Sequence, residues 1–142
     1  MGTSQPNCFP KYVGSVDRPG VLDDDFDEFV RQLDLVVHER GGLWEPLTAS
    51  AVVFPGRSET HGPWPQEACA QVLARWLDAG YLGIYRVESS DAAPTDLSTD
   101  DAEAVLADST AWRPAMGMYL YPTSRGEDAP AEDWRAAAEP SA

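Results

Sequence analysis

The fold of this chain is decided by residues 65–87, which read PQEACAQVLARWLDAGYLGIYRV. Apolar side chains recur at helical spacing from Ala68 to Leu77, and Pro65 stands at the start, where a helix tolerates proline. Gly80 is placed to end that helix in the left-handed conformation. The loosely alternating residues after it favour a strand. The stretch therefore predicts a helix that passes directly into a strand.

Another helix is predicted upstream, over residues 23–40. Its apolar residues form one stripe at helical period, and Gly41-Gly42 follow as its end. Carboxylates crowd its first turns, where they complement the positive end of the helix dipole. They are Asp23, Asp24, Asp25, Asp27 and Glu28. The cluster lacks the alternating ligands and turn glycine of a calcium loop, so it predicts capping and an acidic docking face rather than a metal site.

Residues 43–62 lie between the two helices and leave two interpretations open. The first is a short helix entered at Pro46, and the competing one is a strand over 49–54. Residues 55–62 are a loop by composition. His61 in this loop has no carboxylate beside it in the sequence, as a general base would need.

Residues 88–108 are the most acidic part of the chain, with seven carboxylates and no basic residue. Ser98 and Asp101 have the spacing of a capping box and predict a helix through Leu106. Beyond it, residues 116–121 alternate again, and we expect this strand to return beside residues 81–87.

Together these elements predict an α+β fold of winged-helix-like type, with three to four helices and a two- to three-stranded antiparallel wing. The predicted domain covers residues 23–126. Residues 1–22 form an irregular leader rich in proline and glycine. Residues 127–142 form an acidic tail that we expect to be mobile, with Trp134 available to dock or to anchor a partner.

The chain carries 24 acidic and 10 basic residues, and its net charge is −14 over 142 residues. Such a surface repels nucleic acid and anionic membranes, and attracts a basic partner within about 10 Å. A purely solubilising role is the alternative. The predicted helix of residues 65–78 is also a poor reader of DNA, because its outward charges, Glu67, Arg75 and Asp78, sum to −1.

The sequence contains no catalytic, metal or cofactor motif. Cys8 and Cys69 have the character of free thiols in a reducing compartment. The N-terminus lacks a signal-peptide pattern, and no apolar run approaches the ~20 residues that span a bilayer. We therefore expect a cytoplasmic, non-enzymatic protein that needs no cofactor or metal.

Four aromatic residues near the predicted strands are candidates for an interaction patch, since aromatic side chains recur as binding hot spots. They are Tyr85, Trp112, Tyr119 and Tyr121. Burial in the core is the alternative for each, and it is the favoured one for Trp112.

The order of these elements resembles a known group of proteins. LWEP at 43–46, RWLDAGYLGIYRV at 75–87, TDLSTDDAEAVL at 95–106 and the Thr123–Gly126 turn occur in the same succession. The group consists of small acidic bacterial proteins with winged-helix-like domains, some of them immunity proteins that neutralise secreted toxins. The resemblance covers about residues 25–126, and implies a protein of binding type with no catalytic residue to carry over.

The leading hypothesis is a non-catalytic acidic protein-binding domain, most concretely an immunity-type inhibitor that occludes a basic toxin such as a nuclease. Steering by charge would precede pairing of carboxylates with the Arg and Lys of the toxin. The predicted partner-binding residues are Asp96, Asp100, Asp101 and Glu103, with Asp23, Asp24 and Asp25 as a second patch. The alternatives are a nucleic-acid-binding regulator that uses the helix of residues 65–78, and a phage-type or scaffold accessory protein.

Overall fold

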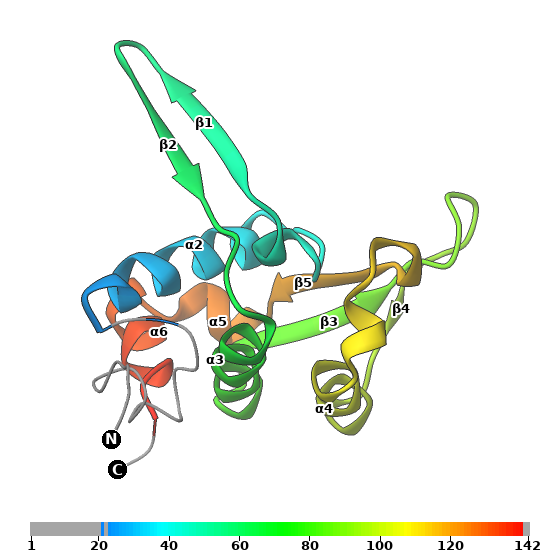
Figure 1. Cartoon of the computed structure of the whole chain (residues 1–142). Coiled ribbons are helices and arrows are strands. Elements are labelled where there is room, and N and C mark those ends of the chain that lie inside the picture. Colours follow the sequence, from blue (N-terminus) through cyan, green and yellow to red (C-terminus); the bar gives the residue numbers. More distant parts are fainter. Residues whose placement is uncertain (1–20, 22, 141–142) are drawn as a thin grey trace, which may run out of the picture.

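The structure is a computed structural model that describes residue 21 and residues 23–140 (Figure 1). Five α-helices and two small antiparallel sheets lie within these residues, which confirms the predicted α+β class. The predicted leader falls outside the described residues, apart from Val21, whose side chain is buried. The helices are α2 (Phe26–His38), α3 (Gln66–Asp78), α4 (Thr99–Ala107), α5 (Ser124–Asp128) and α6 (Ala131–Ala137). The strands are β1 (Ser50–Phe54), β2 (Arg57–His61), β3 (Leu82–Arg86), β4 (Thr95–Asp96) and β5 (Met118–Pro122).

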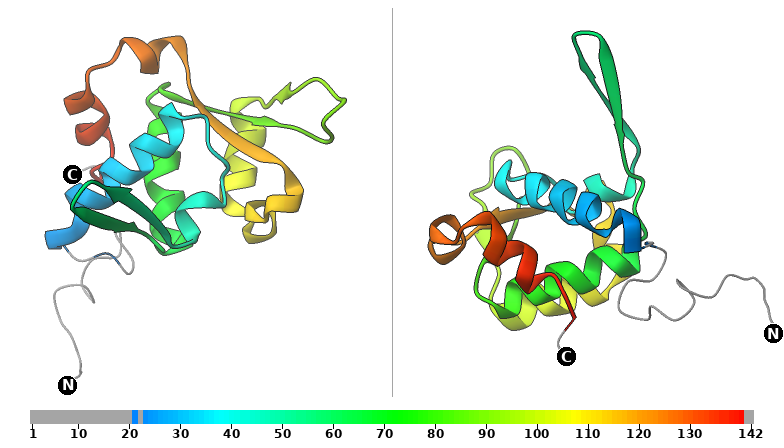
Figure 2. Two further views of the ribbon diagram at one scale, coloured as in Figure 1. Left: turned by 90° about the horizontal axis from the view of Figure 1, so that it is seen from above. Right: turned by 90° about the vertical axis from the view of Figure 1, so that its left-hand side faces the viewer.

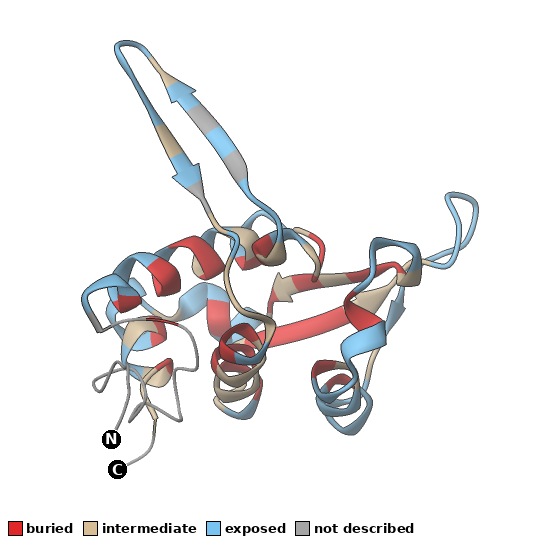
Figure 3. Cartoon of the chain, viewed as in Figure 1, coloured by how far each residue is buried: buried red, intermediate tan, exposed pale blue. Residues whose placement is uncertain are grey.

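The two predicted amphipathic helices are confirmed as α2 and α3. Their apolar stripes are buried, as the red bands along both helices show in Figure 3. The acidic residues ahead of α2 form a separate 3-10 helix over Asp23–Asp25, so α2 itself begins at Phe26. The buried stripes supply most of the core, to which Phe29, Leu33, Leu73 and Trp76 contribute fully buried side chains.

The joint between α3 and β3 has the predicted geometry. Gly80 adopts a φ of 82°, and its N–H donates to the carbonyl of Leu77 over 3.0 Å. The N–H of Tyr81 donates to the carbonyl of Trp76, also over 3.0 Å. This pair of bonds is the Schellman arrangement, which satisfies carbonyls that the helix end would otherwise leave unpaired. The chain thus turns from helix to strand within three residues.

The larger sheet has the order β4-β3-β5 and is antiparallel throughout. Ile84 of β3 pairs with Leu120 of β5, and both side chains are fully buried. The strand predicted to return beside β3 is therefore confirmed. Helix α4 lies in the connection between these two strands, and its N-cap Ser98 accepts from the N–H of Asp101 over 3.1 Å, as the capping box predicts.

The prediction of a short helix entered at Pro46 is wrong. The competing prediction, a strand over residues 49–54, is correct. A 3-10 helix over Glu45–Leu47 is followed by β1, and five of the eight residues of the predicted loop, 55–62, form β2. Pro55-Gly56 makes a two-residue turn, with Gly56 at a φ of 81°. The β1–β2 hairpin stands away from the body in Figure 1 and in the right-hand view of Figure 2. It takes the position that the second helix of a winged-helix unit would occupy in the chain.

The mobile tail predicted for residues 127–142 is also a misassignment, as far as residue 140. Helix α6 packs against the body, and Trp134 is only 1% exposed. Its indole N–H donates to the carbonyl of Gly126 over 3.0 Å, and its ring lies 5.0 Å from that of Trp76. Trp134 is therefore a core residue and offers no anchor to a partner.

Candidate protein-binding surface

The acidic insert, residues 88–108, projects its charge into solvent. All seven of its carboxylate residues are exposed, and none forms an ion pair with any basic side chain in the described part of the chain. Like charges that lie close together without a counter-charge repel each other and attract a cationic partner. These residues are Glu88, Asp91, Asp96, Asp100, Asp101, Glu103 and Asp108.

Three of the predicted site residues are brought together by α4. Ala102 and Leu106 turn the apolar side of this helix into the core. Asp100 and Glu103, three residues apart, are neighbours on the exposed surface of the helix, and Asp101 lies beside them, also exposed. The helix thus holds three carboxylates on a rigid element.

Asp96 belongs to a different part of the insert. It lies on β4, where it pairs with Tyr85 of β3. Its Oδ1 accepts a hydrogen bond from the hydroxyl of Tyr121 on β5. Burial and this hydrogen bond to a carboxylate together raise the pKa of Tyr121 to about 12. Asp96 therefore joins a group of tyrosines rather than the carboxylates of α4.

That group is the tyrosine face, formed by Tyr85, Tyr119, Tyr121 and Trp44. Strand alternation puts the three tyrosines on one side of the sheet, opposite the core-facing residues of β3 and β5. The ring of Tyr85 stacks on that of Tyr119 at 5.4 Å and lies 5.8 Å from that of Tyr121, while Trp44 meets Tyr119 edge-on at 5.3 Å. All four side chains are half-buried. The interaction patch expected at these tyrosines is thus a contiguous surface.

A hollow of about 390 Å³ opens on the tyrosine face, between Tyr85, Tyr121 and Asp96, with Arg40 and Pro94 at its border. The guanidinium of Arg40 lies 6.0 Å from the ring of Tyr121. Aromatic rings beside a carboxylate are a suitable environment for a guanidinium, which can stack on the ring and donate to the oxygens. The hollow thus has the chemistry to receive an arginine from a partner.

Trp112, the fourth aromatic candidate, does not belong to this surface. It is 2% exposed, and its indole N–H donates to the carbonyl of Leu106 over 3.3 Å. Burial in the core, the favoured alternative for this residue, is what the structure shows.

The second predicted patch lies apart from the first. Asp24 and Asp25 are exposed on the 3-10 helix ahead of α2, and Asp23 begins that turn. Figures 1 and 2 show the start of α2 and helix α4 at opposite ends of the molecule. The structure therefore places the predicted residues on two separate surfaces rather than one.

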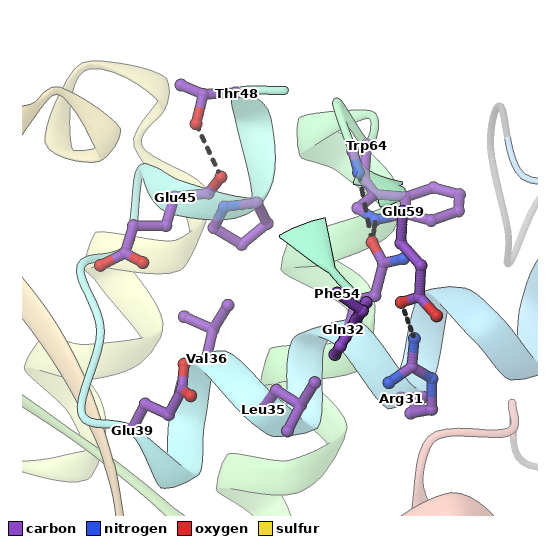
Figure 4. A pocket seen from close by; sticks show the side chains of 12 residues that line it. Arg31, Gln32, Leu35, Val36, Glu39, Glu45, Thr48, Phe54, Glu59 and Trp64 are labelled. Atoms are coloured by element: carbon purple, nitrogen blue, oxygen red, sulfur yellow. Dashed lines mark hydrogen bonds and ion pairs between the residues drawn. The ribbon is translucent and has the colours of Figure 1, made fainter. Parts of the chain in front are cut away.

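A groove of about 370 Å³ between α2 and the base of the hairpin was not predicted, because it exists only once β1 and β2 form (Figure 4). Its apolar walls include Leu35 and Phe54, and Glu59 lies 3.8 Å from Arg31 across it. Gln32 is buried beneath, and its Oε1 accepts from the indole N–H of Trp64 over 2.7 Å. Gln32 thus connects α2 to the segment that follows the hairpin.

Helix α3, which the alternative hypothesis assigns to DNA binding, lies against other helices. Helices α4 and α6 both pack against it, and the Nη1 of Arg75 donates to the carbonyl of Ala138 over 3.0 Å (Figure 2). Its exposed charged residues are Glu67 and Asp78. The basic side chain of this helix is thus turned to the protein, while its exposed charges are acidic.

No protein-family model, curated protein or solved structure matches this chain. The family resemblance, and the function that it implies, therefore stay predictions.

Among the described residues there is no helix of the length and apolarity that a membrane crossing requires. The same residues contain no cluster of three or more His, Cys, Asp or Glu able to hold a metal ion.

Proposed function

We propose that this chain is a non-catalytic acidic protein-binding domain whose partner is a basic protein. The observation that carries the proposal is the set of seven exposed carboxylates in the acidic insert, which have no basic partner in the described part of the chain. Their mutual repulsion is relieved when Arg and Lys side chains of a partner come between them. Complementary charge of this kind speeds association and selects the partner.

Two parts of the surface would act in sequence. The carboxylates of Asp100, Asp101 and Glu103 attract the partner and pair with its cations at the exposed rim. The hollow beside Asp96 then receives an arginine, which stacks on Tyr85 or Tyr121 and donates to the carboxylate. Aromatic residues that bury a cation in this way contribute more affinity than exposed ion pairs do.

The most concrete form of this function is an immunity-type inhibitor that acts in the cytoplasm on a cationic toxin, such as a nuclease. Carboxylates on the inhibitor would occupy the Arg and Lys that the toxin uses to hold phosphates. Binding of the inhibitor and binding of the substrate to the toxin would then be mutually exclusive, because both need the same cations.

The test is affinity capture from the native host at low salt, with identification of the captured protein. The variant Asp100→Lys/Asp101→Lys reverses charge on α4, and Glu132→Lys/Asp133→Lys makes the same change at exposed positions of α6. We expect the wild type and the α6 variant to capture the same basic protein, and the α4 variant to lose it. If both variants lose the captured protein equally, capture depends on net charge alone and not on α4. If the α4 variant still captures the protein, the proposal is overturned. If the captured protein is a nuclease, added wild-type chain should also suppress its activity.

A further inference from the structure

The β1–β2 hairpin has two outer edges. Among the described residues, 21 and 23–140, each of its strands pairs only with the other. Phe54 and Arg57 flank the two-residue turn, so in an antiparallel hairpin they form a hydrogen-bonded pair, and the pairs alternate from there. Ala51 and Val53 therefore belong to the non-bonded pairs and point their N–H and C=O groups away from β2. The outer edge of β1 offers these groups to another strand.

The edge of β1 is also unprotected. Natural proteins guard edge strands with charged residues, proline or bulges. β2 carries Arg57 and Glu59, whereas β1 reads SAVVF, with no charge and no proline. Val53 is 79% exposed, which is far above the 39% of Leu35, the other exposed large hydrophobic residue of the described chain. An edge of this composition favours the addition of a further strand.

The charge of the hairpin allows a second copy of this chain to approach that edge. The hairpin's charged residues are Arg57 and Glu59, whose side chains form an ion pair at 2.7 Å, so the hairpin is neutral within a chain of net charge −14. Another acidic copy can approach here without meeting like charge. The hairpin also extends from the body, which keeps the two bodies apart (Figure 1).

The register of β1 is complementary to itself. In an antiparallel pair centred on Val52, Ala51 of one copy lies opposite Val53 of the other, and both residues carry the outward N–H and C=O groups. The same operation on β2, centred on Glu59, would bring two glutamates face to face, which is unfavourable. Twofold pairing of β1 centred on Val52 thus brings no like charges together, whereas the equivalent pairing of β2 centred on Glu59 does.

We propose that β1 pairs antiparallel with β1 of a second copy about a twofold axis at Val52, which gives a four-stranded sheet in the order β2-β1-β1-β2. Ala51 and Val53 of both copies gather on one face of this sheet. The pairing uses no residue of the acidic insert, so it does not depend on the proposed function.

Site-specific crosslinking tests the register. The variant is Val52→Cys in a Cys8→Ser background. In the proposed dimer, residue 52 of one copy lies opposite residue 52 of the other as a non-hydrogen-bonded pair. The Cα atoms of such a pair are about 4.5 Å apart, which is within the range of a disulfide. Cys69 is fully buried, which leaves it out of the reaction. Glu59→Cys is the matched control, because it is the register partner of Val52 on β2. We expect a disulfide-linked dimer from Val52→Cys and none from Glu59→Cys, and equal crosslinking of the two would overturn the register.

Sedimentation equilibrium over a range of concentrations tests the edge itself. Val53→Pro removes an N–H that points away from β2, and Ser58→Pro removes the corresponding N–H on the other edge. We expect concentration-dependent dimers for the wild type and Ser58→Pro, and a dissociation constant at least about tenfold higher for Val53→Pro. Unchanged circular dichroism would show that both variants fold.

Three outcomes would contradict the pairing. The first is a wild type that stays monomeric at concentrations up to about 1 mM. The second is an equal rise of the dissociation constant in Val53→Pro and Ser58→Pro. The third is a monomeric wild type that captures a basic partner, when Val53→Pro does not capture it. The last of these would assign the edge to a strand of another protein.

Discussion

The indole N–H of Trp76 donates to the backbone carbonyl of Trp134 across 2.8 Å, although 58 residues separate the two in the chain. Their rings also meet edge-on at 5.0 Å. This contact ties the C-terminal helix to the centre of the core. Residues 131–137 are therefore part of the domain.

Replacing Trp134 with alanine should lower the free energy of unfolding by about 3–5 kcal/mol, because it removes a buried indole and leaves a cavity. Chemical denaturation followed by circular dichroism measures this. Trp44→Ala, at a half-buried tryptophan of the tyrosine face, is the control and should cost clearly less. Equal losses would mean that α6 is only loosely attached.

Gln32 should be required for the attachment of the hairpin. Its Oε1 accepts from the indole N–H of Trp64 over 2.7 Å and from the backbone N–H of Gly62 over 3.2 Å. Gln32→Leu leaves these donors without their acceptor, at a cost of about 1–3 kcal/mol. Trp64→Phe removes one donor, so the double variant should lose less than the sum of the single losses. Strict additivity in that cycle would refute the role of the bond.

The hydroxyl of Tyr121 should titrate well above an ordinary tyrosine, with a pKa of about 12 due to burial and the bond to Asp96. Since the unfolded chain ionises near pH 10 and the folded one later, this residue's contribution to stability is complete below pH 10 and is lost as the pH rises toward 12. The difference in tyrosinate absorbance between wild type and Tyr121→Phe isolates the titration. In an Asp96→Asn background the midpoint should fall but stay above 10, since burial remains.

Gly83 should be required for the position of the Tyr121 ring. A Cβ at residue 83 would lie 2.3 Å from Cζ of that tyrosine, so Gly83→Ala pushes the ring away from Asp96. We expect the pKa of Tyr121 to fall toward its usual range, with little loss of stability because the displaced group is the end of a side chain. Stability should be unaffected by Gly83→Ala in a Tyr121→Ala background, where no ring opposes the new methyl group.

The sequence predicts those elements whose pattern comes from burial on one side. Helices α2 and α3 each bury one stripe, so helical periodicity marks both, and Gly80 marks the end of α3. The hairpin gives no such pattern, because it stands away from the body and the apolar side chains of Ala51 and Val53 are exposed. The Pro55-Gly56 pair was the feature of the sequence that could have indicated a hairpin turn.

Long-range contacts explain the other differences. Trp134 stands alone among polar residues in its segment, and its burial depends on Trp76 and Tyr81 from elsewhere in the chain. For the site, the exposure of the acidic insert follows from its composition and could be predicted. Three residues of the tyrosine face, Tyr85, Tyr119 and Tyr121, are among the predicted aromatic candidates. The fourth, Trp44, could not be predicted, because its position beside Tyr119 depends on a long-range contact.

The acidic insert is closed at its base by Val87, whose N–H donates to the carbonyl of Gly117 over 2.9 Å. Gly117 has a φ of 69°, and a Cβ there would lie 2.2 Å from the carbonyl oxygen of Val87, so only glycine fits. Before β3 and β5 can pair, the ends of a segment that repels itself must find each other. Closure of that loop is slow when charge is unscreened, so added salt should accelerate refolding of this protein. The charge for which we propose a role in recognition would thus act as a kinetic barrier during folding.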